Sequence, residues 1–311
     1  MQYPDIRQKL PSIGSVLLGC FLSWALFPSL LSAIETSSFK ELLLPHPPVI
    51  QVVEKAQPAQ PQLPASQSET LPKETRQKRT FYLCASPNSL PYSSRDLDMP
   101  GYELEIGKEV GKILGINIRV EYLRAYRPRD YAECDFLMGV IQPEDEEENS
   151  RGRFFTSKPY YGTGNVLVIP KEAQGIKSID DLDKNLKIGI EPGSWAHYIL
   201  THKKGFTVTP YVTQEDIIEA MANKEIQAAV VTAAAVGWYL KQHPDAPIKV
   251  PEGYVPEPEL RWNVVMGVNK TNKDLEEAIN AALTLLTQNG TIQSIMAKYG
   301  VPYYPPFPPT K

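Results

Sequence analysis

Residues 102–123 read YELEIGKEVGKILGINIRVEYL, and this stretch decides the fold class. Its apolar residues recur at helical spacing: Leu104, Ile106, Val110, Ile113 and Leu114. Gly115 ends the predicted helix, and residues 116–123 then alternate as a strand. The same succession of short strands and helices continues along the chain from Thr80, which predicts an α/β protein with parallel sheets.

The other predicted elements follow from the same two periodicities. The predicted strands are 80–85, 116–123, 134–141, 160–169, 186–190, 226–231 and 264–268. The predicted helices are 102–114, 178–182, 193–201, 233–242, 272–288 and 291–299. One more helix is expected to begin after Thr213, because Asp216 stands at the third position after it and completes a capping box.

The charge of the chain argues against nucleic acid as a partner. Residues 80–311 hold 24 Lys and Arg against 30 Asp and Glu, a net charge of −6. No basic stripe is present, and nucleic-acid binding depends on one. Three cysteines and four histidines lack metal-ligand spacing, and no phosphate loop or dinucleotide fingerprint occurs. Neither a metal, nor a cofactor, nor a catalytic constellation is predicted, so the chain is not expected to be an enzyme.

The N-terminus has the pattern of an export signal. Arg7 and Lys9 precede a charge-free stretch from Leu10 to Ile34. The stretch is longer than a usual signal and long enough to span a bilayer. Residues 1–34 are therefore either a cleaved signal peptide or a retained membrane anchor, and both place the body in the periplasm. The membrane is expected to be met only through this segment.

Residues 35–79 are predicted to be a disordered linker. Seven prolines lie between Pro45 and Pro72, and the segment has no apolar periodicity. A segment of this composition cannot bury enough surface to offset chain entropy. The folded body is therefore expected to begin at Thr80.

Three motifs resemble those of type II periplasmic solute-binding proteins, in the branch that binds polar amino acids. They are FTSKPYY at 155–161 with Val166–Val168, LKIGI at 186–190 with Gly193 and Ser194, and the closing helices from Ala278 to Gly300. The resemblance implies a two-lobed fold with two hinge crossings. Lobe 1 would comprise 80–161 and 263–311, and lobe 2 would comprise 162–262. A ligand would lie between the lobes at the carboxyl ends of strands.

A narrower resemblance concerns five motifs. They are LCASPNSLPY at 83–92, CDFLMGV at 134–140, KPYY at 158–161, MGV at 266–268 and YGVP at 299–302. Together they are similar to the MxaJ/XoxJ family of methanol-oxidation accessory proteins. The resemblance implies a periplasmic factor that assembles or activates a PQQ-dependent methanol (alcohol) dehydrogenase, with that quinoprotein and its cytochrome c as the partners to expect. PQQ and metal would belong to the dehydrogenase. The alternative is the receptor of an ABC importer for a small polar solute.

The resemblance also shows that an amino-acid clamp is weakened. The arginine of that branch falls at Asn149, with Arg151 and Arg153 out of step. Ser86 and Thr232 stand where ligand-binding aspartates would. A buried charge needs a partner, so the cleft is expected to take a neutral or different ligand. The candidate ligand-binding residues are Ser86, Asn88, Tyr92, Tyr160, Ser194, Trp195 and Thr232.

Cys84 and Cys134 are a candidate disulfide in an oxidising compartment. If their strands are parallel neighbours in level register, the two cysteines are offset by about four residues, or ~13 Å. That offset exceeds bridging distance, so the spacing argument favours two buried thiols.

The predicted boundary at Thr80 has a direct test by truncation. A chain that begins at Thr80 should melt cooperatively at nearly the temperature of one that begins at Ile34. A chain that begins at Ser86 should not fold, because it lacks a central strand. Thermal unfolding followed by circular dichroism measures both. A midpoint lowered by ten degrees or more on trimming to Thr80, on the order of several kcal/mol, would show that the linker packs on the body.

Overall fold

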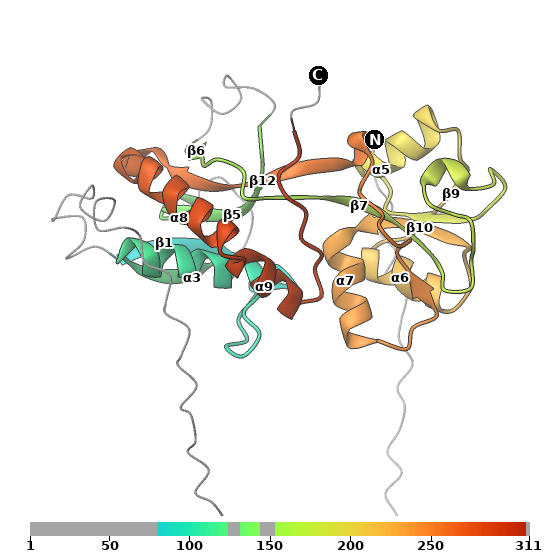
Figure 1. Cartoon of the computed structure of the whole chain (residues 1–311), viewed down its shortest axis with the longest axis horizontal. Coiled ribbons are helices and arrows are strands. Elements are labelled where there is room, and N and C mark those ends of the chain that lie inside the picture. Colours follow the sequence, from blue (N-terminus) through green and yellow to red (C-terminus); the bar gives the residue numbers. More distant parts are fainter. Residues whose placement is uncertain (1–79, 124–130, 144–152, 309–311) are drawn as a thin grey trace, which may run out of the picture. The chain divides into compact units, whose positions relative to one another are not determined.

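The computed structural model describes residues 80–123, 131–143 and 153–308. The predicted export segment, the predicted linker and Asn149 lie outside these described residues. Among the helices that are described, none has the length and apolar character needed to cross a bilayer. The account below concerns the body of the chain, which is drawn in colour in Figure 1.

The first half of the described chain builds strands around one long helix. Its elements are β1 (Thr80–Ala85), β2 (Asn88–Ser89), β3 (Ser93–Ser94), α3 (Tyr102–Leu114), β4 (Asn117–Tyr122), β5 (Phe136–Ile141) and β6 (Phe154–Thr156). The C-terminal helices return to it: η5 (Lys270–Leu275), α8 (Glu276–Gln288) and α9 (Thr291–Lys298). Figure 1 shows α3, α8 and α9 together on this side of the body, where α3 contacts β1 and β5 and the other two helices pack on α3.

The intervening residues form a second set of elements. The strands are β7 (Tyr161–Pro170), β8 (Ile188–Ile190), β9 (Val208–Pro210), β10 (Ala228–Thr232), β11 (Ile248–Lys249) and β12 (Arg261–Asn269). The helices are η2 (Ile179–Asp181), α5 (Trp195–Tyr198), the π-helical η3 (Ile199–Lys203), α6 (Gln214–Ala222), α7 (Ala233–Gln242) and η4 (Pro258–Leu260). In Figure 1, α6 and α7 lie next to β10.

The buried apolar side chains gather mainly in two large clusters, which define the two lobes. The lobe 1 cluster surrounds α3, α8 and α9, and the lobe 2 cluster surrounds β7, β10, α6 and α7. Ala234 of α7 packs in the first cluster, and Tyr304 of the C-terminal tail packs against the second. Each lobe therefore contributes a residue to the other. The predicted boundaries between the lobes stay a prediction.

Eight of the described strands join in one path, β4-β1-β5-β12-β7-β10-β8-β9, while β6 and β11 pair beside it and β2 pairs with β3 in a separate sheet. The prediction of parallel sheets is only partly correct. β1 is parallel to β4 and β5, and β8 is parallel to β9 and β10. However, β12 is antiparallel to β5 and to β7, and β7 is antiparallel to β10. The reason is that the chain leaves lobe 1 along β7 and returns along β12, in the opposite direction.

The two segments predicted as crossings pair with each other. Tyr161–Gly164 of β7 lie opposite Arg261–Val264 of β12, and Asn165–Val168 of β7 pair instead with β10. One strand therefore belongs to the sheets of both lobes. The C-terminal tail covers this pairing, because the Gly162 N–H donates to the Tyr304 carbonyl at 2.8 Å. The Phe307 N–H donates to the Asn263 side chain at 2.7 Å.

Several predicted helix signals are confirmed, whereas several predicted boundaries are wrong by two residues or more. Thr213 and Asp216 form the capping box of α6, and Gly115 ends α3 in a left-handed conformation with φ 65°. The helix expected over 193–201 is instead the four-residue α5, which continues as the π-helix η3. The strand expected from Cys134 begins two residues later, at Phe136, because the chain turns before it.

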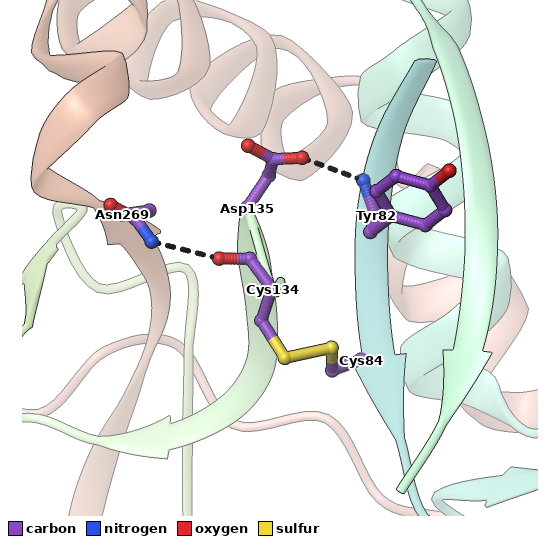
Figure 2. The surroundings of a disulfide bond; sticks show 5 residues. All are labelled: Tyr82, Cys84, Cys134, Asp135 and Asn269. Atoms are coloured by element: carbon purple, nitrogen blue, oxygen red, sulfur yellow. Dashed lines mark hydrogen bonds between the residues drawn. A yellow bond between two sulfur atoms is a disulfide. The ribbon is translucent and has the colours of Figure 1, made fainter. Parts of the chain in front are cut away.

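The spacing argument against a disulfide is also wrong. Cys84 and Cys134 are bonded, with 5.6 Å between their Cα atoms (Figure 2). The register places Leu137 opposite Cys84, so an extended chain would indeed leave Cys134 three positions away. The chain is not extended there, because the Cys134 N–H donates to the Tyr131 carbonyl in a turn. The turn brings the two sulfur atoms together.

Hydrogen bonds fix the turn on both sides of the disulfide. The Tyr82 N–H donates to the carboxylate of the buried Asp135 at 2.9 Å. The Asn269 side chain donates to the Cys134 carbonyl at 2.9 Å (Figure 2). The disulfide therefore joins β1 to the residues just before β5. Asn269, at the end of β12, holds the same residues by its hydrogen bond to the Cys134 carbonyl.

Reduction of this disulfide should destabilise the body. The bond closes a loop of 50 residues, and cross-links of this kind contribute about 2–4 kcal/mol. A reducing agent should therefore lower the melting midpoint by roughly 5–15 °C. The Cys84→Ser/Cys134→Ser double variant should melt near the reduced protein and should not respond to reductant. Equal midpoints for the oxidised and reduced protein would contradict the structure.

Candidate ligand-binding site

A groove of about 540 Å³ is lined by side chains from both lobes. Lobe 1 contributes the segment from Asn88 to Tyr92 and Ser94, which follows the end of β1. Lobe 2 contributes the N-terminal part of α6, Thr232 at the end of β10, and one face of α7. The lining from α7 is aromatic at Trp238 and Tyr239. No lysine or arginine is among the described residues that line this groove.

Polar side chains of the two lobes meet at the groove. The side chain of Tyr92 from lobe 1 interacts with the side chain of Thr232 from lobe 2. The Thr232 hydroxyl donates to the Gln214 side-chain carbonyl at 2.8 Å, and the Thr232 N–H donates to the same oxygen at 2.9 Å. The Gln214 side chain in turn donates to Glu191 at 3.2 Å. Thr232 is therefore already satisfied by Gln214, and a ligand that accepted from Thr232 would have to displace that side chain.

The pKa of Tyr92 is raised to about 12. Burial of the phenol is the largest cause, the hydrogen bond with Thr232 acts in the opposite direction, and the charge of Glu103 adds to the rise. Tyr92 is therefore a neutral phenol at any physiological pH. It acts in the groove as a hydrogen-bonding and packing residue.

A second group of side chains lies behind Tyr92, at the start of α3. Tyr102 and Tyr161 share a hydroxyl–hydroxyl hydrogen bond of 3.1 Å, and the rings of Tyr160 and Tyr161 are in edge contact at 5.1 Å. Burial is the main cause that raises the pKa of each of these three phenols, and the charge of Glu103 raises it further. Burial also raises the pKa of Glu103 itself to about 7. Glu103 is therefore the titratable group of this cluster near neutral pH.

The structure brings three of the seven predicted residues together in the groove. These are Asn88, Tyr92 and Thr232. Ser86 is partly buried just after β1 but does not line this groove. Tyr160 is fully buried in the lobe 1 core, as a packing residue beside Tyr161. Whether any of the seven contacts a ligand stays a prediction.

Ser194 and Trp195 lie elsewhere, around α5. The Ser194 hydroxyl donates to the Glu191 carbonyl at 2.8 Å and accepts from the His197 N–H at 3.1 Å, so it is a helix cap. Trp195 is 58% exposed, and its indole N–H donates to the Glu259 carbonyl at 2.7 Å. Its ring stacks on Tyr198 at 5.1 Å. Neither residue lines the groove.

The sequence analysis missed two residues that line the groove and one residue that lies behind Tyr92. Trp238 and Tyr239 lie on a helix that was assigned only to packing, and their adjacent positions give no helical stripe that would mark a second face. Glu103 lies within the stretch that predicted α3, where an acid in the first turn is ordinary. Its carboxylate lies against Gly139 of β5, a long-range contact that no local pattern reports.

The described residues offer no metal centre. Nowhere in 80–123, 131–143 or 153–308 do three or more His, Cys, Asp or Glu side chains gather in a way that would hold an ion. The groove instead offers amide, hydroxyl and aromatic groups, with Glu215 and His243 at its exposed side. This arrangement is suited to holding a small polar solute rather than to bond-making chemistry.

Comparison with protein families identifies the fold. The model of the bacterial extracellular solute-binding proteins, family 3, matches residues 82–302. The chain belongs to this family, which is extracytoplasmic and non-enzymatic. The predicted type II periplasmic binding protein fold and the prediction that the chain is not an enzyme are therefore confirmed.

Curated relatives are distant in sequence. The L-cystine-binding protein TcyJ of Escherichia coli K12 is 22% identical over 213 residues, which cover 67% of this chain and 77% of the relative. The histidine-binding periplasmic protein of the same strain is 24% identical over 231 residues, which cover 68% and 84%. Such identity supports the family but does not transfer a ligand.

Solved structures give the same fold. The L-cystine solute receptor of Neisseria gonorrhoeae, in its unliganded open conformation, is similar with a TM-score of 0.61 and 22% identity. The match covers 74% of this chain and 96% of that one. The periplasmic binding protein XoxJ from Methylobacterium extorquens AM1 is similar with a TM-score of 0.55 and 26% identity, over 72% and 98% of the two chains.

Glu103 should make stability depend on pH. Its pKa is raised from 4.5 to about 7, so the folded protein holds this proton more tightly than the unfolded chain. Its contribution to stability is therefore favourable below about pH 4.5 and is lost as the pH rises to about 7. Glu103→Gln removes this loss, so the variant should gain on the native protein across that window, by about 3 kcal/mol at most.

Chemical denaturation at a series of pH values measures the difference between the two proteins. Glu109→Gln, on the same helix, is the matched control, since it removes a carboxylate that is paired with Lys112 at the surface. Its difference from the native protein should not grow between pH 4.5 and 7. A Glu103→Gln difference that stays constant with pH would show that Glu103 has an ordinary pKa.

Proposed function

We propose that this family 3 solute-binding protein is the receptor of an ABC importer and that it binds a small polar solute between its lobes. The groove supports this, because polar side chains from both lobes meet there around about 540 Å³. A cavity of this size suits a solute of roughly amino-acid to sugar size. The family and its curated relatives, two of which are named for amino acids, support the receptor role.

We further propose that the solute is not an α-amino acid. Holding a zwitterion needs a cation for the carboxylate and an anion for the ammonium group. The groove has no lysine or arginine among its described residues, and Thr232 stands where an aspartate would. Thr232 is also engaged by Tyr92 and Gln214. The name of a relative at 22–24% identity does not outweigh these substitutions.

A second candidate function is accessory to a dehydrogenase. The similarity to XoxJ at 26% identity and the five motifs that resemble the MxaJ/XoxJ family favour it. In this role the protein would assemble or activate a PQQ-dependent alcohol dehydrogenase, which would itself carry PQQ and metal. The proposed location is the periplasm in both cases, with residues 1–34 acting as a signal or as a tether.

Calorimetry with each of the twenty amino acids tests the proposed ligand class. No heat of binding should be detected at micromolar concentrations, because burial of an unpaired ligand charge costs several kcal/mol. The histidine-binding protein of Escherichia coli, titrated with histidine under the same conditions, is the positive control. Micromolar binding of any amino acid here would contradict the proposal.

A pull-down separates the two candidate functions. The tagged protein, incubated with periplasmic extract, should not retain a quinoprotein dehydrogenase if it serves an importer. The same protein should stimulate ATP hydrolysis by the cognate permease and ATPase in liposomes when its solute is present. Stoichiometric recovery of a PQQ enzyme, with activity that depends on this protein, would favour the accessory role instead.

A further inference from the structure

The C-terminal tail, residues 301–308, joins the two lobes a third time. Val301 is buried in the lobe 1 cluster, and Tyr303 packs against the same cluster. The next residue, Tyr304, packs against the lobe 2 cluster instead, and its hydroxyl donates to the Tyr254 carbonyl at 3.3 Å. Adjacent side chains of an extended chain point to opposite sides, which is how two neighbouring residues reach different lobes. The tail is drawn in dark red in Figure 1, where it crosses β7 and β12.

The tail binds both strands of the β7–β12 pairing at the same level. Gly162 of β7 and Asn263 of β12 lie directly opposite each other. The Gly162 N–H donates to the Tyr304 carbonyl at 2.8 Å. The Asn263 side chain accepts from the Phe307 N–H at 2.7 Å and donates to the Phe307 carbonyl at 2.9 Å. A change in the angle between the two strands therefore has to stretch or break hydrogen bonds of the tail.

The ring of Phe307 presses the tail onto the two strands. A Cβ at Gly162 would lie 2.6 Å from an atom of this ring and 2.9 Å from the Pro305 carbonyl oxygen, so the tail lies in direct contact with β7. The Arg261 guanidinium of β12 lies over the same ring, 4.5 Å from its centroid. A cation over an aromatic face is attracted to it, and this contact adds to the hydrogen bonds on the β12 side.

The composition of the tail makes it stiff. Four of its eight residues are prolines, at positions 302, 305, 306 and 308. Each proline ring fixes its own φ, so a segment rich in proline has few other conformations and acts as a semi-rigid spacer. A stiff segment that is bound to both strands resists their movement, whereas a glycine-rich segment of the same length would follow it.

We propose that residues 301–308 form a strap that restrains the β7–β12 pairing and thereby sets how far the two lobes move relative to each other. A segment changes such an equilibrium only through contacts that differ between the arrangements, and the contacts with Gly162 and Asn263 are of this kind. Among the described residues that line the groove, none belongs to the tail. The strap therefore acts on solute affinity without touching the solute. This consequence for affinity rests on the proposed receptor function, whereas the restraint itself does not.

The test measures the distance between the lobes in the full chain with no solute added. Spin labels are attached at Lys108→Cys and Asp245→Cys, both exposed positions. Cys20→Ser removes the cysteine that lies outside the disulfide. Pulsed electron paramagnetic resonance then gives the distance distribution. A chain that ends at Val301 should show a distribution roughly 1.5-fold wider than the native one, or more, because the strap is gone.

Gly162→Ala tests the strap without removing any part of the chain. The three atoms nearest to the added Cβ belong to Phe307 and Pro305, so the substitution pushes the tail away. Gly162 has no positive φ, so alanine suits the strand itself. The variant should widen the distribution about as much as the truncation does. In the chain that ends at Val301 the same substitution should add nothing, which makes this combination the matched control.

Hydrogen exchange at residue 162 shows whether the tail has been released. Its N–H then lacks the Tyr304 carbonyl and should exchange roughly tenfold faster. Faster exchange with an unchanged distance distribution would overturn the inference. Equal widening by Gly162→Ala with and without the tail would also overturn it, because the substitution would then act on the strand itself.

Two further outcomes separate the strap from the other claims. If alanine is accommodated and exchange is not faster, the truncated chain decides, and an unchanged distribution there overturns the strap. If the strap variants widen the distribution while no low-molecular-mass fraction of periplasmic extract shifts it, the strap stands and the proposed receptor function fails.

Discussion

The antiparallel pairing of β7 with β12 is the constraint on which the rest of the structure depends. Tyr161–Gly164 and Arg261–Val264 are the segments through which the chain passes between the two cores. Both segments are extended and hydrogen-bonded to each other, so a two-stranded ribbon joins the lobes. A ribbon of this kind twists and bends more readily than a packed core shears.

Close packing on this ribbon explains why glycine is needed at certain positions and how the proline-rich C-terminal tail is held. A Cβ at Gly162 would meet the ring of Phe307 at 2.6 Å, so the tail reaches the strand only because this residue is glycine. Arg261 lies over the same ring at 4.5 Å, and Asn263 holds the backbone of Phe307 on both sides. Gly237 and Gly300 make a similar close approach between α7 and the end of α9. The lobes therefore meet at the ribbon, at a glycine contact and at the groove that Tyr92 and Thr232 line.

The sequence predicts the local structure well, because its signals act within a few residues. The helix over 102–114, its end at Gly115 and the capping box at Thr213 are all confirmed. The direction of β12 could not be predicted locally, since it follows from the chain crossing between lobes. The disulfide was missed because a turn at Cys134 replaces the extended chain that the spacing argument assumed.

The residues of the candidate site likewise divide into those that the sequence could predict and those that it could not. Asn88, Tyr92 and Thr232 follow strand ends, and strand ends meet at a cleft in any fold of this kind. Ser194 and Trp195 follow a strand end as well, but the short α5 uses one as a cap and leaves the other at the surface. Glu103 has no sequence signal, because its character comes from burial beneath residues that are distant in sequence.

We propose that the two lobes, which bind a small solute between them, close on it by bending at the β7–β12 ribbon. The most direct test of this closure is a distance between the lobes. Spin labels at Lys108→Cys and Asp245→Cys, both exposed positions, would report it by pulsed electron paramagnetic resonance. Addition of the low-molecular-mass fraction of periplasmic extract should shorten and narrow the distance distribution. A distribution unchanged by every such fraction would contradict the account.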